Sequence, residues 1–121
     1  MSEKHPAISI DFKTRKRIRI HKATLQLLGD PKYIQILINP KSNAIAIRSG
    51  DPTDPLSLRV RRGLSDDGCH EVCSLDLTNS LMHMYKNWED GKSYRINGEM
   101  AGNENIALFF IRNMTEIKEN R

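Results

Sequence analysis

Short runs of alternating apolar and polar residues recur along this chain, and they constrain its fold more than any other feature. Residues 7–12, 17–20, 44–48 and 56–61 follow the two-residue period of strands with one buried face. Residues 33–38 are almost continuously apolar, which is typical of a central strand. A length of 121 residues fits one domain, so we predict a single, mainly β domain spanning residues 1–121.

Two segments break this period and predict short helices. Residues 21–28 suit about two helical turns, which Gly29 and the following Asp30-Pro31 would end. Thr78 or Asn79 can cap a second helix, which would end at residues 89–91. An apolar stripe of this kind most often faces a core. The stripe of the second helix consists of Leu81, Met82, Met84, Tyr85 and Trp88.

The same order of elements occurs on both sides of residues 49–55, where two prolines and three turn formers break all periodicity. Residues 56–61 and 72–77 read as the first two strands of the second half, and residues 94–96 and 106–111 as its closing hairpin. We therefore predict an α+β fold, a pseudo-twofold β-barrel built from two ββαββ repeats, 7–48 and 56–111. We expect the polar residues 112–121 to fray.

Positive charge is concentrated in the first half of the chain. Residues 13–22 contain six lysines or arginines, His21 and no acid, whereas the net charge of the whole chain is only +4. A second basic cluster follows residues 49–55. Such a strand face attracts polyanions, but it can also be merely solvated or prevent edge-to-edge aggregation. The nine candidate residues are Lys13, Arg15, Lys16, Arg17, Arg19, Lys22, Arg59, Arg61 and Arg62.

Metal and catalytic motifs are weak in this sequence. Cys69 and Cys73 lie four residues apart without a second cluster, and on a strand that spacing corresponds to about 13 Å, too far for one ion. We find no nucleophile in a Ser/His/Asp context and no glycine-rich phosphate loop. We therefore predict a protein that is not an enzyme and has no catalytic residues, metal, cofactor or evident small-molecule substrate.

The lack of long apolar stretches in the sequence bears on cellular location. No apolar stretch reaches the roughly 18 residues that a membrane span needs. The first residues, MSEKHPAIS, lack the apolar region of a signal peptide. We expect a cytoplasmic protein with reduced cysteines and without membrane contact.

The segment from Ile8 to Arg48 resembles the AbrB-like (SpoVT/AbrB-type) swapped-hairpin domain of bacterial transition-state regulators and many antitoxins. The likeness rests on the strand of residues 8–12, a basic turn, the segment RIRI at residues 17–20, a helix ending at Leu27-Leu28-Gly29, and the hairpin to residue 48. A tandem relative, the repressor associated with cell-division and cell-wall gene clusters, carries two such units in one chain. The resemblance implies interlocked hairpins and a tandem-repeat arrangement.

The resemblance also implies DNA as the partner, contacted by Arg15, Lys16, Arg17 and Arg19. Arginine pairs with phosphates through two hydrogen bonds and can read guanine edges, and the release of counterions drives binding. We predict a DNA-binding protein of the transcription-regulator type. The alternative is a protein-interaction or accessory module of a phage or mobile element. A homodimer through the second helix or through residues 108–111 stays open.

Overall fold

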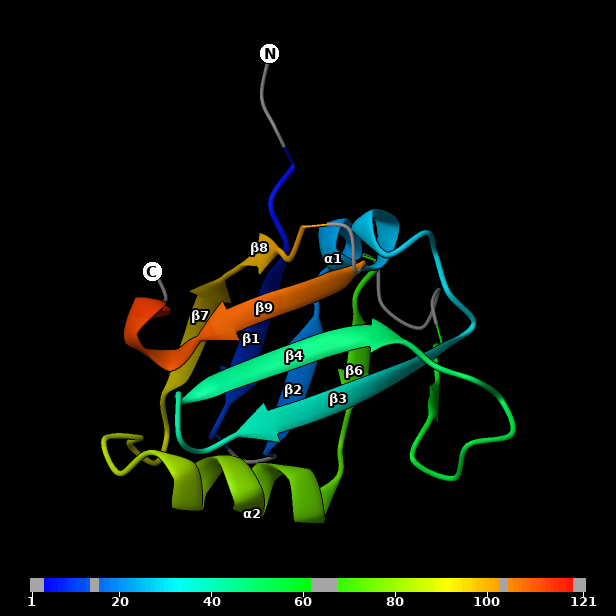
Figure 1. Ribbon diagram of the computed structural model, residues 1–121. Helices are drawn as coiled ribbons and strands as arrows, with labels where there is room; N and C mark the ends of the chain where they lie inside the picture. Colours follow the sequence, from blue (N-terminus) through cyan, green and yellow to red (C-terminus); the bar gives the residue numbers. More distant parts are fainter. Residues whose placement is uncertain (1–3, 14–15, 62–67, 103–104, 119–121) are drawn as a thin grey trace.

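The computed structural model describes residues 4–13, 16–61, 68–102 and 105–118. Within them, two five-stranded antiparallel sheets pack face to face, and two α-helices lie at opposite ends of this sandwich (Figure 1). This arrangement confirms the prediction of a mainly β protein with two short helices. The described strands form two separate sheets and no closed barrel, so the pseudo-twofold barrel, like the division into two repeats, stays a prediction.

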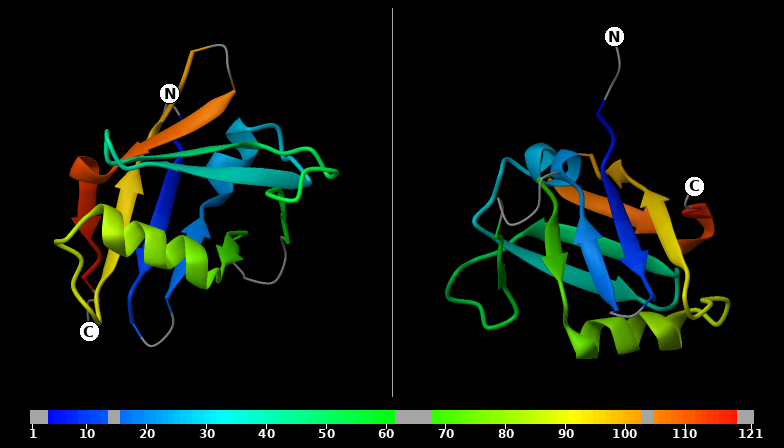
Figure 2. Two further views of the ribbon diagram at one scale, coloured as in Figure 1. Left: turned by 60° about the horizontal axis from the view of Figure 1, so that its bottom comes forward. Right: turned by 180° about the vertical axis from the view of Figure 1, so that it is seen from behind.

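Sheet A has the strand order β10-β7-β1-β2-β6, and it faces the viewer in the right panel of Figure 2. Ile8 of β1 pairs with Ile20 of β2 and with Ile96 of β7, so these three side chains share the inner face. All three are fully buried. The strands are β1 (Ala7–Asp11), β2 (Arg17–Ile20), β6 (His70–Val72), β7 (Ser93–Asn97) and β10 (Met114–Glu116).

Sheet B has the order β5-β3-β4-β9-β8, and its strands lie in front of sheet A in Figure 1. Ile47 of β4 and Phe109 of β9 face sheet A and are fully buried. Burying a side chain of this size stabilises a fold by about 1.5–3 kcal/mol relative to leaving it exposed. The strands are β3 (Tyr33–Asn39), β4 (Ala44–Ser49), β5 (Leu58–Arg59), β8 (Glu99–Met100) and β9 (Ile106–Phe110).

The first helix, α1 (Lys22–Leu27), lies where the sequence predicts it. Gly29 follows it with φ +83°, a left-handed conformation that suits glycine. Thr24 anchors this helix to β1, because its hydroxyl accepts a hydrogen bond from the Ala7 N–H (2.8 Å) and donates one to the Ala7 carbonyl (2.7 Å). Because β1 leads into the middle of sheet A, this contact fixes the beginning of the central strand.

The second helix begins earlier and ends earlier than predicted. Ser74 caps α2 (Leu75–Met84), because its hydroxyl accepts a hydrogen bond from the Leu77 N–H (3.3 Å). The cap overrides the strand-like alternation that predicted a strand over residues 72–77, of which β6 contains only Val72. Trp88 lies beyond the helix, but it packs with Phe12 (centroids 5.1 Å apart) and its indole N–H donates to the Leu81 carbonyl.

The closing hairpin predicted for residues 94–111 is wrong. Strand β7 pairs with β1 and β10 in sheet A, whereas β9 pairs with β4 and β8 in sheet B. The chain crosses between the sheets at Gly98, which separates β7 from β8. Two further predictions fail at the ends of the second half. The strand over residues 56–61 shortens to β5, with Leu56 exposed, and residues 114–116 form β10 instead of fraying.

Candidate nucleic-acid interface

The predicted basic residues divide between the outer face of sheet A and the neighbouring end of sheet B. Arg17 and Arg19 lie on β2, and Lys22 is the first residue of α1. Lys13 follows β1 and Lys16 precedes β2. Arg59 belongs to β5 and is followed closely by Arg61. Arg15 and Arg62 lie outside the described residues.

Arg17 is held by carboxylates of the same chain. Its Nε lies 3.2 Å from Asp11 Oδ2 and its guanidinium nitrogen Nη1 lies 2.7 Å from Glu71 Oε1. Partial burial raises the pKa of Asp11, but hydrogen bonds from the Lys13 N–H, the Ser93 hydroxyl and Arg17 outweigh it and hold that pKa below its usual value. The positive charge of Arg17 is therefore largely neutralised, and its main effect is to join β1, β2 and β6.

A single row of paired residues crosses all five strands of sheet A beside this ion pair. Arg19 stands between Glu71 of β6 and Ser9 of β1, and Arg95 of β7 stands on the other side of Ser9. Directly paired residues share a face of the sheet, and this face is the outer one, since the neighbouring isoleucines face the core. The row therefore places one arginine on each side of the small residue Ser9.

These side chains line a pocket of about 500 Å³. Lys22 contributes a third cation, and its aliphatic stem lies against Gly68, where a Cβ atom would come within 3.2 Å of Lys22 Cδ. Ser9 is 6% exposed, and its Oγ lies 2.7 Å from His21 Nε2, a hydrogen bond whose donor depends on the tautomer of His21. The lining consists of Ser9, Arg19, His21, Lys22, Ala23, Cys69, Arg95 and Ile117.

Arg95 is absent from the residues predicted from the sequence. The alternation of Tyr94, Arg95 and Ile96 shows only that Arg95 points away from a core. Its place beside Ser9 depends on the pairing of β7 with β1, which are 86 residues apart at this position, counted from Ser9 to Arg95. No local pattern encodes that pairing.

A second, smaller pocket of about 320 Å³ lies where β5 approaches β6. Arg59 and Arg61 line it together with His70 and Glu71. His70 Nδ1 accepts a hydrogen bond from the Arg61 N–H (3.1 Å), so this ring nitrogen is unprotonated. Burial lowers the pKa of His70, and the charge of Arg61 lowers it further, against opposing effects of the hydrogen bond from Arg61 and of Glu71.

We expect the free energy of unfolding to fall on acidification because of His70. The unfolded His70 titrates near 6.5 and the folded one at a lower pKa, so its contribution is complete above pH 6.5 and is lost as the pH falls to the folded value. One proton changes this free energy by at most about 1.4 kcal/mol per pH unit. Urea denaturation at pH 7.5, 6.5 and 5.5 tests this. The pH dependence should be weaker in His70→Gln, and equal slopes in both proteins would contradict the assignment.

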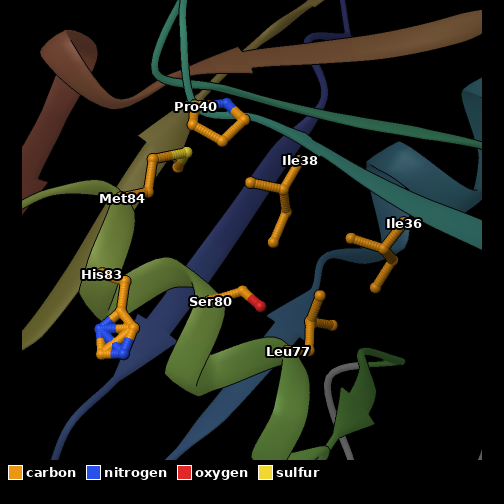
Figure 3. Close-up of a pocket in the computed structure, with 7 residues that line it drawn as sticks. All are labelled: Ile36, Ile38, Pro40, Leu77, Ser80, His83 and Met84. Carbon is orange, nitrogen blue, oxygen red and sulfur yellow. The ribbon is translucent and has the colours of Figure 1, made fainter.

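A third pocket, between β3 and α2, is apolar and also has a volume of about 500 Å³. Figure 3 shows Ile36 and Ile38 of β3 facing Leu77 and Ser80 of α2 across it. The Ser80 hydroxyl donates to the Asp76 carbonyl of its own helix (2.9 Å). The described lining contains no permanently charged side chain, which suits an apolar group and not an anion, so this pocket is no part of the basic surface.

Metal-binding side chains are dispersed in the described part of the chain, where no three His, Cys, Asp or Glu residues gather around one point. Cys69 is buried in the lining of the pocket that contains Arg19, and Cys73 is exposed at the other end of β6, where it lines the pocket that contains Arg59. Neither forms a disulfide. Among the described residues, no helix is both long and apolar enough to span a membrane.

Comparison of the chain with protein-family models, with curated proteins and with solved structures finds no significant match.

Proposed function

We propose that this protein binds duplex DNA through the outer face of sheet A, as a non-catalytic DNA-binding protein of the transcription-regulator type. One observation carries the proposal: Arg19, Lys22 and Arg95 surround a single pocket on one side of the molecule. Arg59 and Arg61 extend the positive charge toward β5. Four different elements supply Arg19, Lys22, Arg95 and Arg59, and Arg61 follows the last of them, so a run of basic residues in the sequence does not account for their convergence.

The physical basis is the negative charge of the DNA backbone. Arginine and lysine side chains bind phosphate oxygens and release the counterions that surround DNA, which makes the affinity strongly dependent on salt. The carboxylates of Asp11 and Glu71 both form ion pairs with Arg17, so their negative charge mainly neutralises that arginine. The resemblance of residues 8–48 to the AbrB-like domain, with its pseudo-twofold barrel, supports the same function and belongs to this proposal.

Fluorescence anisotropy with a labelled duplex tests the proposal. We expect binding at low ionic strength, with a logarithm of affinity that falls linearly with the logarithm of the salt concentration. The double variant Lys22→Gln and Arg61→Gln should bind roughly tenfold more weakly and show a salt slope shallower by about 2, since each lost phosphate contact contributes about 0.9.

The matched control is the double variant Lys41→Gln and Arg112→Gln, which removes the same charge elsewhere. Lys41 lies in the turn between β3 and β4, and Arg112 stacks on Phe110 (4.9 Å from its centroid), so neither lines the basic pockets. We expect its affinity to stay within about twofold of the original protein. Equal losses of DNA affinity in both double variants would mean that binding depends on net charge alone. That result would overturn the proposed interface.

A protein-interaction module is the second candidate function, and the outer face of sheet B favours it. Leu37, Ala46 and Leu108 pair across β3, β4 and β9, next to the pair of Ala44 with Phe110. They line a hollow of about 400 Å³, and Leu37 is 38% exposed. A second copy of the chain or another protein would bury this apolar surface. Absence of DNA binding at low ionic strength would favour this function.

A further inference from the structure

We propose that the pocket on the outer face of sheet A is a phosphate-binding site, in which one phosphate group lies between Arg19 and Arg95 above Ser9. The inference rests on the proposed function in naming a nucleic-acid phosphate as the natural occupant. The site itself follows from the geometry of the row that pairs Arg19 with Ser9 and Ser9 with Arg95.

The spacing of the two arginines suits a single tetrahedral anion. Neighbouring strands lie about 4.8 Å apart, so the Cα atoms of Arg19 and Arg95 are separated by two such steps, roughly 10 Å. A gap of this width leaves room for one phosphate, to which both guanidinium groups can donate hydrogen bonds. Arg95 Nε donates to Asn97 Oδ1 (3.1 Å), so the terminal nitrogens of Arg95 would bind the anion. Ser9 is the smallest residue of the three, so the floor of the gap is low enough for the anion to enter.

The hydroxyl of Ser9 supplies a further donor at the floor of the pocket. Its Oγ lies 2.7 Å from His21 Nε2, and this contact holds the hydroxyl in one direction. When His21 carries its proton on Nε2, it donates to Ser9 Oγ and leaves the hydroxyl hydrogen for a phosphate oxygen. His21 is therefore a positioning residue, and Ser9 is the residue that touches the anion.

The charge of the lining also favours an anion. Three described residues of the pocket are permanent cations, Arg19, Lys22 and Arg95, and none of its described lining residues is acidic. Of the described carboxylates, that of Glu71 lies 4.0 Å from Arg19 Nε but only 2.7 Å from Arg17 Nη1. Among the described residues, Glu71 is therefore bound mainly by Arg17, and the described lining of the pocket carries positive charge without an acid.

The test uses inorganic phosphate and the full chain without DNA. Phosphate is titrated at constant ionic strength against chloride, and the backbone amides are followed by NMR. We expect a saturable shift of the amide signals around Ser9, Arg19 and Arg95. The exposed Arg95 should be replaceable without loss of the fold, and Arg95→Gln should weaken phosphate binding about tenfold or more, as a lost charged hydrogen bond does. Ser9→Ala should weaken it as well, and the control Arg112→Gln should leave it unchanged.

The DNA titration separates this inference from the proposed function. If DNA binds but phosphate gives no saturable shift, or if Arg95→Gln binds phosphate as the original protein does, the phosphate site is wrong and the DNA interface stands. If phosphate binds and Arg95→Gln abolishes this while no duplex binds, the site stands. The proposed function then falls, and the occupant is a small phosphorylated molecule.

Discussion

Replacing Gly98 by alanine should destabilise the protein by roughly 3 kcal/mol, because overpacking against fixed atoms forces the backbone to shift. A Cβ atom at this position would lie 2.3 Å from the Leu108 carbonyl oxygen and 2.6 Å from Cδ1 of Phe109. Leu108 pairs with both Ala46 and Glu99 inside sheet B, and Phe109 is fully buried. Neither residue can therefore move away from the added atom without a large cost in free energy. The expected fall in melting temperature is about 10–15 °C.

Glu99→Ala is the control for this variant. Glu99 is the next residue along the chain and is exposed, so its truncation should change the melting temperature by no more than about 2 °C. Calorimetry on both variants provides the comparison. If Gly98→Ala were as stable as Glu99→Ala, the close approach of the crossing segment to β9 would be incorrect.

Thr24→Val should cost about 2–3 kcal/mol, although valine has nearly the volume of threonine. The Thr24 side chain is fully buried, and its hydroxyl bonds both the N–H and the carbonyl of Ala7. The carbonyl keeps a second partner, the His21 N–H at 3.2 Å, but the variant leaves the Ala7 N–H without this acceptor. A buried donor without an acceptor carries its full desolvation cost.

Thr24→Ser separates the hydroxyl from the methyl group. Serine keeps both hydrogen bonds and loses only a buried methyl, for which we expect about 1 kcal/mol. In urea denaturation, the Thr24→Val variant should therefore have a lower free energy of unfolding than the Thr24→Ser variant. The opposite order would mean that packing of the methyl group, and not the bridge to Ala7, holds α1 against β1.

The local features of the first half were predictable because they depend on neighbouring residues alone. The alternation of apolar residues places β1, β2 and β4 and identifies their buried faces, and Gly29 ends α1. In the second half, the same reasoning failed where two local signals competed. Ser74 begins a helix inside an alternating run, because its hydroxyl caps one of the free N–H groups of the first turn, that of Leu77, and this outweighs a short strand pattern.

The candidate site was predictable only in part, because some of its contacts join residues that are far apart in the sequence. The basic run from Lys13 to Lys22 identified Arg19 and Lys22, whose charges are visible in the sequence. The run could not show that Arg17 is occupied by Asp11 and Glu71, since Glu71 reaches it from β6, a strand far along the chain.

The sequence by itself determined which residues alternate between core and solvent, because the period of a strand follows from backbone stereochemistry. Tertiary structure alone decided which strands became neighbours. Strand β7 pairs with β1 and not with β9. This pairing places Arg95 opposite Ser9 and completes the basic pocket. Pairing partners are selected by burial of whole sheet faces against one another, and that free energy belongs to distant residues together and to no local segment.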